Sequence, residues 1–168
     1  MSKKQTVEQA LAALRERQDQ VVAKGSGAAA LIDVNTNTLK ARVAHDKIMA
    51  MREPAGQVRD NIRFTPRQLV LAKMYFVLAD AGFEPKEVKG LDANFPERAI
   101  LKTIEHPSWV CWVREINGSP VIANKIDGSP PSPGTYKDTD SVLVISIGRL
   151  VCHLALSLYE RDNQCSAA

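Results

Sequence analysis

Residues 64–83 read FTPRQLVLAKMYFVLADAGF and carry the strongest helix signals in the chain. Thr65 is a favourable N-cap, and Gln68 three residues later completes a capping box. Pro66 falls at the first helical position, where its missing N–H costs nothing. Gly82 suits the left-handed conformation that ends many helices. The sequence therefore specifies both ends of one helix.

This predicted helix, at about residues 66–81, is apolar nearly all round, with Lys73 and Asp80 as the exceptions. A helix without a polar face is buried. Its length of roughly 24 Å crosses a small domain but is short for a bilayer. We expect it to be the core helix, with its aromatic side chains filling space rather than lining a ligand pocket.

The composition predicts one folded cytoplasmic protein with a basic amino-terminal part. Hydrophobic residues make up 45% of the 168 residues and charged residues 24%, which is ordinary for a folded domain. Residues 1–67 hold 12 Lys+Arg against 7 Asp+Glu, whereas residues 68–168 hold 10 against 12, which sums to the net charge of +3. We predict a basic helical arm over residues 1–60, a compact α+β domain over 61–162 and a tail over 163–168.

No membrane or secretory segment is expected. The start of the chain carries positive charge without an apolar segment after it. The apolar run Val142 to Leu158 is 17 residues long and contains Arg149 and His153, so it is too short and too charged for a confident span. The three cysteines match neither a disulfide framework nor a metal-binding pair.

The amino-terminal part predicts two helices. Helical spacing of apolar residues that include Leu11 and Leu14 favours an amphipathic helix over about residues 6–24, ended by Gly25-Ser26-Gly27. Residues 28–34 fit either a short strand or an apolar linker. A second helix is expected after the turn or N-cap cluster of residues 35–38, and it would display the basic side chains of Lys40, Arg42 and Lys47.

Two short helices are expected after the central one. The first begins at a proline and stops at Gly90, and the second covers about residues 96–104. Arg98 and Lys102 lie one turn apart on the second helix and therefore share a face. A closing helix is expected within about residues 141–160, with a strand over 142–147 leading into a helix after Gly148 as the alternative.

Asn117-Gly118 predicts a β-hairpin over about residues 109–126, because a type I′ turn needs positive φ at both turn residues. A two-residue loop pairs Ile116 with Ser119 and Val113 with Ile122. One face would then point into the core. Trp112 and Val121 lie on the opposite face together with Arg114, which leaves a second apolar surface that needs cover or a partner.

Catalytic and metal-binding patterns are absent from the sequence. Cys152 and His153 are neighbours, and adjacent helical residues point about 100° apart, so they do not form a nucleophile–base pair. His106 and Cys111 lack the further ligands that zinc requires. The sequence has no glycine-rich phosphate loop and no GxSxG or HExxH motif. We expect no catalytic residue, metal or cofactor, and an enzyme is the least favoured function.

Two functional hypotheses follow. The order long helix, short helix, helix, hairpin, helix resembles that of a winged helix-turn-helix, which implies a small bacterial regulatory protein that binds double-stranded DNA, often as a homodimer. Its DNA contacts would come from Arg98, Lys102 and Arg114, with Lys40, Arg42 and Lys47 of the basic arm. The alternative is a module for protein–protein interaction or assembly, which would bind its partner through Trp112, Val121, Leu11 and Leu14.

Overall fold

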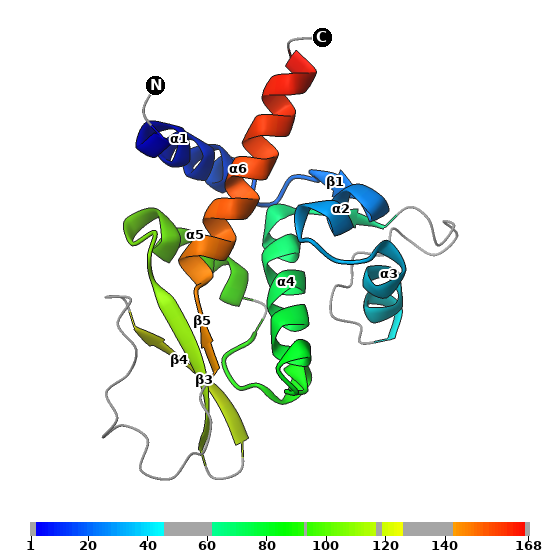
Figure 1. Cartoon of the computed structure of the whole chain (residues 1–168), viewed down its shortest axis with the longest axis vertical. Helices are drawn as coiled ribbons and strands as arrows, with labels where there is room; N and C mark the ends of the chain where they lie inside the picture. The colour runs from blue at the N-terminus through cyan, green and yellow to red at the C-terminus, as the bar shows by residue number, and fades with distance from the viewer. Residues whose placement is uncertain (1–2, 46–61, 93, 117–118, 126–142, 167–168) are drawn as a thin grey trace. The chain divides into compact units, whose positions relative to one another are not determined.

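The computed structural model describes residues 3–45, 62–92, 94–116, 119–125 and 143–166. These residues form six α-helices and two small antiparallel sheets, so the predicted helix-rich α+β class is confirmed (Figure 1). In this part of the chain, no helix combines the length and the apolar character needed to cross a bilayer.

The chain forms two compact units. Unit 1 comprises residues 1–73 and 154–168, and unit 2 comprises residues 74–153. The chain passes from one unit to the other within helix α4, Pro66–Asp80, and again within helix α6, Ile147–Ser166. The predicted division at residues 60 and 162 stays a prediction.

Unit 1 contains three further helices and a two-stranded ribbon, in addition to parts of α4 and α6. In chain order these elements are α1 (Lys3–Glu16), β1 (Ala23–Lys24), α2 (Gly25–Leu31), α3 (Thr36–His45) and β2 (Arg63–Phe64). β1 and β2 are antiparallel and pair Ala23 with Phe64 and Lys24 with Arg63. The ribbon thus joins the segment before α2 to the segment before α4.

Two predictions for the amino-terminal part are wrong. α1 ends at Glu16 instead of continuing to residue 24, and Gly25-Ser26-Gly27 begins α2 instead of ending a helix. Residues 28–31, expected in a strand or linker, are helical. Ala28 and Ala29 are fully buried, so tertiary packing stabilises a helix that is too short and too rich in glycine to form alone. The second predicted helix is confirmed as α3 over Thr36–His45, and its predicted continuation through Lys47 lies outside the described residues.

The predicted caps of α4 are confirmed. In unit 1 the Thr65 backbone N–H donates to Gln68 Oε1 at 2.7 Å, and the Gln68 N–H donates to Thr65 Oγ1 at 3.4 Å. In unit 2 the last helical residue, Asp80, is followed by Gly82, whose φ is 85°, and the Phe83 N–H donates to the Leu78 carbonyl at 2.9 Å. No residue from 66 to 79 is exposed, as expected for a core helix.

Unit 2 combines a three-stranded sheet with short helical segments and parts of α4 and α6. Its elements are the 3₁₀ helix η1 (Pro85–Glu87), α5 (Phe95–Glu105), β3 (Val110–Ile116), β4 (Ser119–Lys125) and β5 (Leu143–Ile145). The strand order is β4-β3-β5 and all pairs are antiparallel (Figure 1). The hairpin has the predicted register, with Ile116 opposite Ser119 and Val113 opposite Ile122, while its turn lies outside the described residues.

The preferred prediction for residues 142–147 is wrong. Residues 143–145 form β5, and α6 begins at Ile147 and ends at Ser166 rather than near residue 160. Pairing with the buried strand β3 stabilises the short strand. The Gly148 N–H donates to the Trp109 carbonyl at 3.1 Å, and a Cβ on Gly148 would lie 2.0 Å from the Pro107 carbonyl oxygen. The helix therefore starts where only glycine fits.

Candidate nucleic-acid interface

α2 and α3 are joined by a four-residue turn, residues 32–35, whose backbone is fixed by hydrogen bonds. The Val34 N–H donates to the Ala29 carbonyl at 3.0 Å, and the Asp33 N–H donates to the Ala30 carbonyl at 3.3 Å. This is the Schellman pattern, in which the residue after the helix takes a left-handed conformation. Asp33 takes that role with φ of 54°, which aspartate tolerates better than most side chains. The chain direction therefore changes at a defined point.

Asn35 fixes the start of α3. Its side-chain oxygen Oδ1 accepts the backbone N–H of Asn37 at 2.9 Å and that of Thr38 at 3.4 Å. An N-cap of this kind satisfies N–H groups that the helix cannot pair internally, and it typically contributes about 1 kcal/mol. The cluster of residues 35–38, predicted as a turn or N-cap, is the N-terminal end of this helix.

The two helices are neighbours in space, and each has a buried side. The buried residues are Ala28 and Ala29 of α2, and Leu39 and Val43 of α3, which are one helical turn apart. Alanine on one helix allows the backbones to approach closely. From α4, the Lys73 ammonium donates to the Ile32 carbonyl at 2.6 Å, at the end of α2. Helix α4 thus braces the turn within unit 1.

The opposite face of α3 is exposed and polar. Asn37, Thr38, Ala41 and Arg42 are exposed, and their spacing places them within one sector of the helix, away from Leu39 and Val43. This sector offers an amide, a hydroxyl, a methyl and a guanidinium group. Asparagine pairs with adenine, arginine with guanine, and methyl groups contact thymine in the major groove of DNA. The sector carries no carboxylate.

The electrostatics around α2 and α3 favour a polyanion. In the described residues 23–45 and 62–64, four side chains are lysine or arginine and only Asp33 is a carboxylate. The cationic residues are Lys24, Lys40, Arg42 and Arg63. Contacts between such cations and phosphates supply much of the affinity of proteins for nucleic acid. Of the predicted nucleic-acid contacts, Lys40 and Arg42 therefore lie in this region, while Lys47 lies outside the described residues.

Arg98, predicted to contact DNA from α5, braces a loop of unit 2. Its guanidinium donates to the Asp92 carboxylate at 3.1–3.4 Å and to the Gly90 carbonyl at 3.2 Å. Partial desolvation raises the pKa of Asp92, but the hydrogen bond and charge of Arg98 and the N–H of Asn94 outweigh it. The pKa of Asp92 therefore lies below its usual range. The Arg98 guanidinium is thus engaged with a carboxylate of its own unit.

Lys102 and Arg114 are the other nucleic-acid contacts that were predicted in unit 2. The Lys102 ammonium lies 5.4 Å from the centre of the Trp109 ring, within the range of a cation–π interaction. Arg114 lies in β3 opposite Val121, and its side chain is outside the described part of the structure. Arg98 and Lys102 thus lie one turn apart on α5, as predicted, while the position of the Arg114 side chain relative to them is not described.

The predicted partner-binding residues lie mostly in the interior. Leu11 and Leu14 are each 3% exposed in unit 1, and Trp112 is 7% exposed in unit 2. Val121 is half-buried. Within the described residues the Trp112 indole N–H has no hydrogen-bond partner. These side chains thus offer little apolar surface to a partner in this conformation.

Cys111 and Cys152 are the cysteines whose side chains the structure describes, and their settings do not favour reactivity. Burial raises the pKa of the Cys111 thiol to about 12, and it also raises the pKa of Cys152. Both are free thiols. Among the residues that the structure describes, no group of three His, Cys, Asp or Glu side chains could hold a metal ion.

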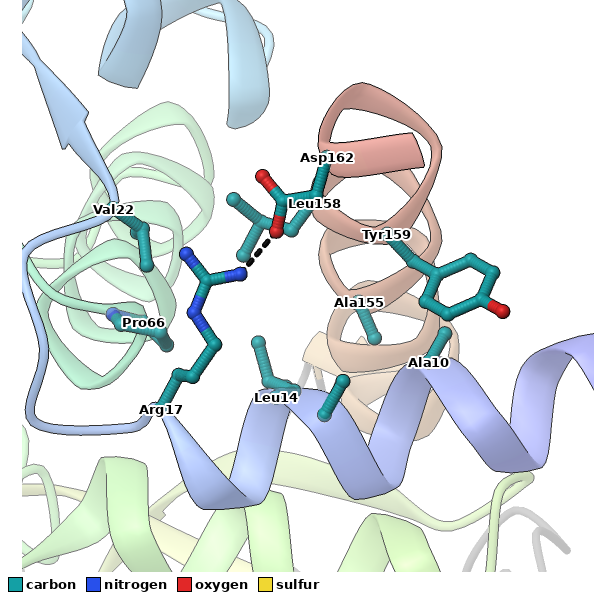
Figure 2. Close-up of a pocket in the computed structure, with 10 residues that line it drawn as sticks. Ala10, Leu14, Arg17, Val22, Pro66, Ala155, Leu158, Tyr159 and Asp162 are labelled. Atoms are coloured by element: carbon teal, nitrogen blue, oxygen red, sulfur yellow. Dashed lines mark hydrogen bonds and ion pairs between the residues drawn. The ribbon is translucent and has the colours of Figure 1, made fainter. Parts of the chain in front are cut away.

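A small cavity lies inside unit 1, next to the ion pair between Arg17 of α1 and Asp162 of α6 (Figure 2). Its volume is about 30 Å³, enough for one or two water molecules but far below a ligand pocket. Its apolar lining includes Ala10, Leu14 and Leu158. This pocket is bordered by a salt bridge and is too small to bind a ligand.

Asn37 and Thr38 were not among the predicted nucleic-acid contacts, because residues 35–38 were interpreted only as a turn or an N-cap cluster. The feature of the sequence that could have identified them is the N-cap residue Asn35. It places the next residues in the first turn of α3, and recognition helices of DNA-binding proteins make base contacts through their N-terminal residues. No family model, curated protein or solved structure matches the chain.

Proposed function

We propose that this protein is a DNA-binding regulatory protein that recognises double-stranded DNA through α2 and α3 of unit 1. In this proposal the two helices act as a helix-turn-helix, and α3 enters the major groove. The main support for this proposal is the exposed sector of α3. Its residues face away from the buried side of the helix, and they are Asn37, Thr38, Ala41 and Arg42.

The order of elements in unit 1 also supports the proposal. The elements follow one another in the order α1, β1, α2, α3, β2, and the two strands pair with each other. This order places the two helices of a helix-turn-helix between two paired strands, with the second helix of the motif as the reading helix. The helix-turn-helix that the sequence suggested for residues 64–160 is therefore proposed for unit 1 instead.

The side chains of α3 predict what such a helix would read. Asn37 suits adenine, Arg42 suits guanine, and the methyl groups of Thr38 and Ala41 suit thymine. A well-placed bidentate pair contributes about 1–3 kcal/mol of discrimination between bases. We expect binding to depend on sequence, with non-specific binding to any duplex at low salt.

The test is the selection of duplexes from a randomised pool with the full chain, followed by fluorescence anisotropy with the enriched duplex. Arg42→Ala is expected to weaken binding by about tenfold or more, since it removes both a base contact and a charge. Asn37→Ala is expected to broaden the set of enriched sequences.

Arg98→Ala is the matched control, because it also removes an exposed arginine side chain from a helix, in this case α5 of unit 2. It is expected to leave DNA affinity unchanged. The proposal is wrong if no duplex is bound at low salt, or if Arg98→Ala weakens binding as strongly as Arg42→Ala does.

A further inference from the structure

The two edges of the sheet in unit 2 differ in how they are covered. Beside β4, the Lys89 N–H donates to the Pro120 carbonyl and the Lys89 carbonyl accepts the Ile122 N–H, both at 2.8 Å. Natural sheets block an edge in this way, by covering it with a loop and by placing a proline on it. Beside β5, the other edge strand, no described residue forms such a bridge. Among the described residues, β5 is therefore the open edge.

The two Lys89 bonds also show which way the backbone groups of β4 point. Successive residues of an antiparallel strand direct their N–H and C=O groups to opposite sides. Because Pro120 and Ile122 direct these groups toward Lys89, Val121 between them directs its own toward β3. Val121 is opposite Arg114, so the backbone groups of Arg114 point back toward β4.

The same alternation along β3 determines which groups of β5 face outward. Val113 and Cys111 alternate with the residues that point toward β4, so their backbone groups point toward β5. They are opposite Leu143 and Ile145, which therefore form the hydrogen-bonded pairs with β3. Val144 lies between these two residues. Its N–H and C=O thus point away from β3, toward the open edge.

The side chain of Val144 adds apolar surface to this edge. It is 47% exposed, whereas Leu143 is half-buried and Ile145 is buried. It lies opposite Trp112 of β3, so the two side chains share a face of the sheet. Strand β5 contains neither a charged residue nor a proline, which are the residues that keep edges from pairing. A strand with these properties is a template for a further strand.

The open edge is complementary to itself. Val144 is the central residue of β5, and it supplies one outward donor and one outward acceptor. Two copies related by a two-fold axis at Val144 would exchange both bonds, as a hydrogen-bonded antiparallel pair does. This register places Leu143 of one copy opposite Ile145 of the other, so every opposed pair is apolar. The row formed by Trp112 and Val144 would also continue across the axis, which a short foreign peptide would not provide.

We propose that the protein forms a homodimer in which β5 pairs antiparallel with β5 of a second copy, about a two-fold axis at Val144. The sheets of the two copies then form one continuous sheet. This inference goes beyond the proposed function and does not depend on DNA binding.

The first test is sedimentation equilibrium of the full chain over a wide range of concentrations. The natural protein is expected to form dimers. Val144→Lys should raise the dissociation constant by about tenfold or more, because it places like charges opposite each other at the axis. Val144→Thr keeps a β-branched side chain and should still form dimers. Val21→Lys is the matched control, since Val21 is 48% exposed and lies outside this sheet, and it should leave the dissociation constant unchanged.

The second test examines the register. The two Val144 Cα atoms would lie about 5.5 Å apart in a hydrogen-bonded pair, which is within the range of a disulfide. Val144→Cys, in a chain that also carries Cys152→Ser and Cys165→Ser, should therefore give a covalent dimer on mild oxidation. Val21→Cys in the same chain should give far less.

Either test can overturn the proposal. A natural protein that stays monomeric at every concentration contradicts it. A dimer that persists unchanged in Val144→Lys uses another interface, and the proposal is then wrong as well. Circular dichroism establishes that Val144→Lys is folded, and if it is not, the absence of the Val144→Cys cross-link decides against the proposal.

Discussion

Replacing Lys73 with methionine tests how α4 holds the turn between α2 and α3. The Lys73 ammonium donates to the Ile32 carbonyl at 2.6 Å in a partly buried setting. Methionine keeps a flexible stem of similar length but cannot donate a hydrogen bond. The variant therefore leaves the carbonyl at the end of α2 without this donor and changes little else.

The expected loss follows from the kind of bond. Hydrogen bonds to charged groups contribute about 1.5–3 kcal/mol, and partial exposure argues for the lower end. A loss of about 1.5 kcal/mol lowers the melting temperature of a chain of this size by roughly 3–6 °C. We also expect DNA affinity to fall by up to about tenfold, because a less firmly held turn must be ordered again on binding.

Thermal unfolding followed by circular dichroism measures the first effect, and fluorescence anisotropy with a duplex measures the second. Lys73→Arg keeps a charged donor and should recover most of the stability. Lys89→Met is the matched control, since Lys89 is exposed in unit 2 and its hydrogen bonds to other described residues run through its backbone. A melting temperature equal to that of the natural protein, or an equal loss in Lys89→Met, would refute the reasoning.

Three further predictions concern unit 2. The buried Trp109 indole N–H donates to Thr103 Oγ1 at 2.8 Å. Thr103→Val removes this acceptor and should lower the free energy of unfolding in urea by about 1–3 kcal/mol. Thr103→Ser should lower it less, and equal losses in the two variants would contradict this reasoning. Gly148→Ala should cost at least about 2 kcal/mol, since its Cβ would lie 2.0 Å from the Pro107 carbonyl oxygen, and an unchanged melting temperature would show that the contact is wrong. Burial raises the pKa of Cys111 to about 12, so its thiol stays protonated at about pH 8; iodoacetamide should label it only after unfolding, and rapid labelling in the folded protein would contradict its burial.

Local signals account for the parts of the fold that the sequence predicted well. The capping box at Thr65 and Gln68 and the glycine at residue 82 determine the ends of α4, and all of these interactions lie within a few residues. The Asn117-Gly118 pair predicted the register of the hairpin for the same reason. Each of these features needs no knowledge of distant residues.

The elements that were missed depend on tertiary contacts. α2 has seven residues with two glycines, so it has neither the length nor the propensity to form alone, and it is helical because Ala28 and Ala29 are buried against neighbours. β5 has three residues in an apolar run that also fits a helix, and pairing with β3 decides between the two. Sequence periodicity cannot resolve either case.

The candidate site was predicted in part. Lys40 and Arg42 were expected on a basic helix, which is α3. Arg98 was expected to face DNA because it is a cation on a helix surface, yet it binds Asp92 and the Gly90 carbonyl across a loop. The sequence shows which cations exist, but only the fold shows that Arg98 also holds a loop of its own unit.

The most direct test of α3 as the reading helix is methylation interference on the duplex enriched by the full chain. Dimethyl sulfate methylates guanine at N7 in the major groove and adenine at N3 in the minor groove. We predict that methylation of one or more guanines at N7 blocks binding, and that Arg42→Ala removes this interference at a guanine that Arg42 contacts. Interference confined to adenine N3, or a pattern that Arg42→Ala leaves unchanged, would contradict the assignment of α3 to the major groove.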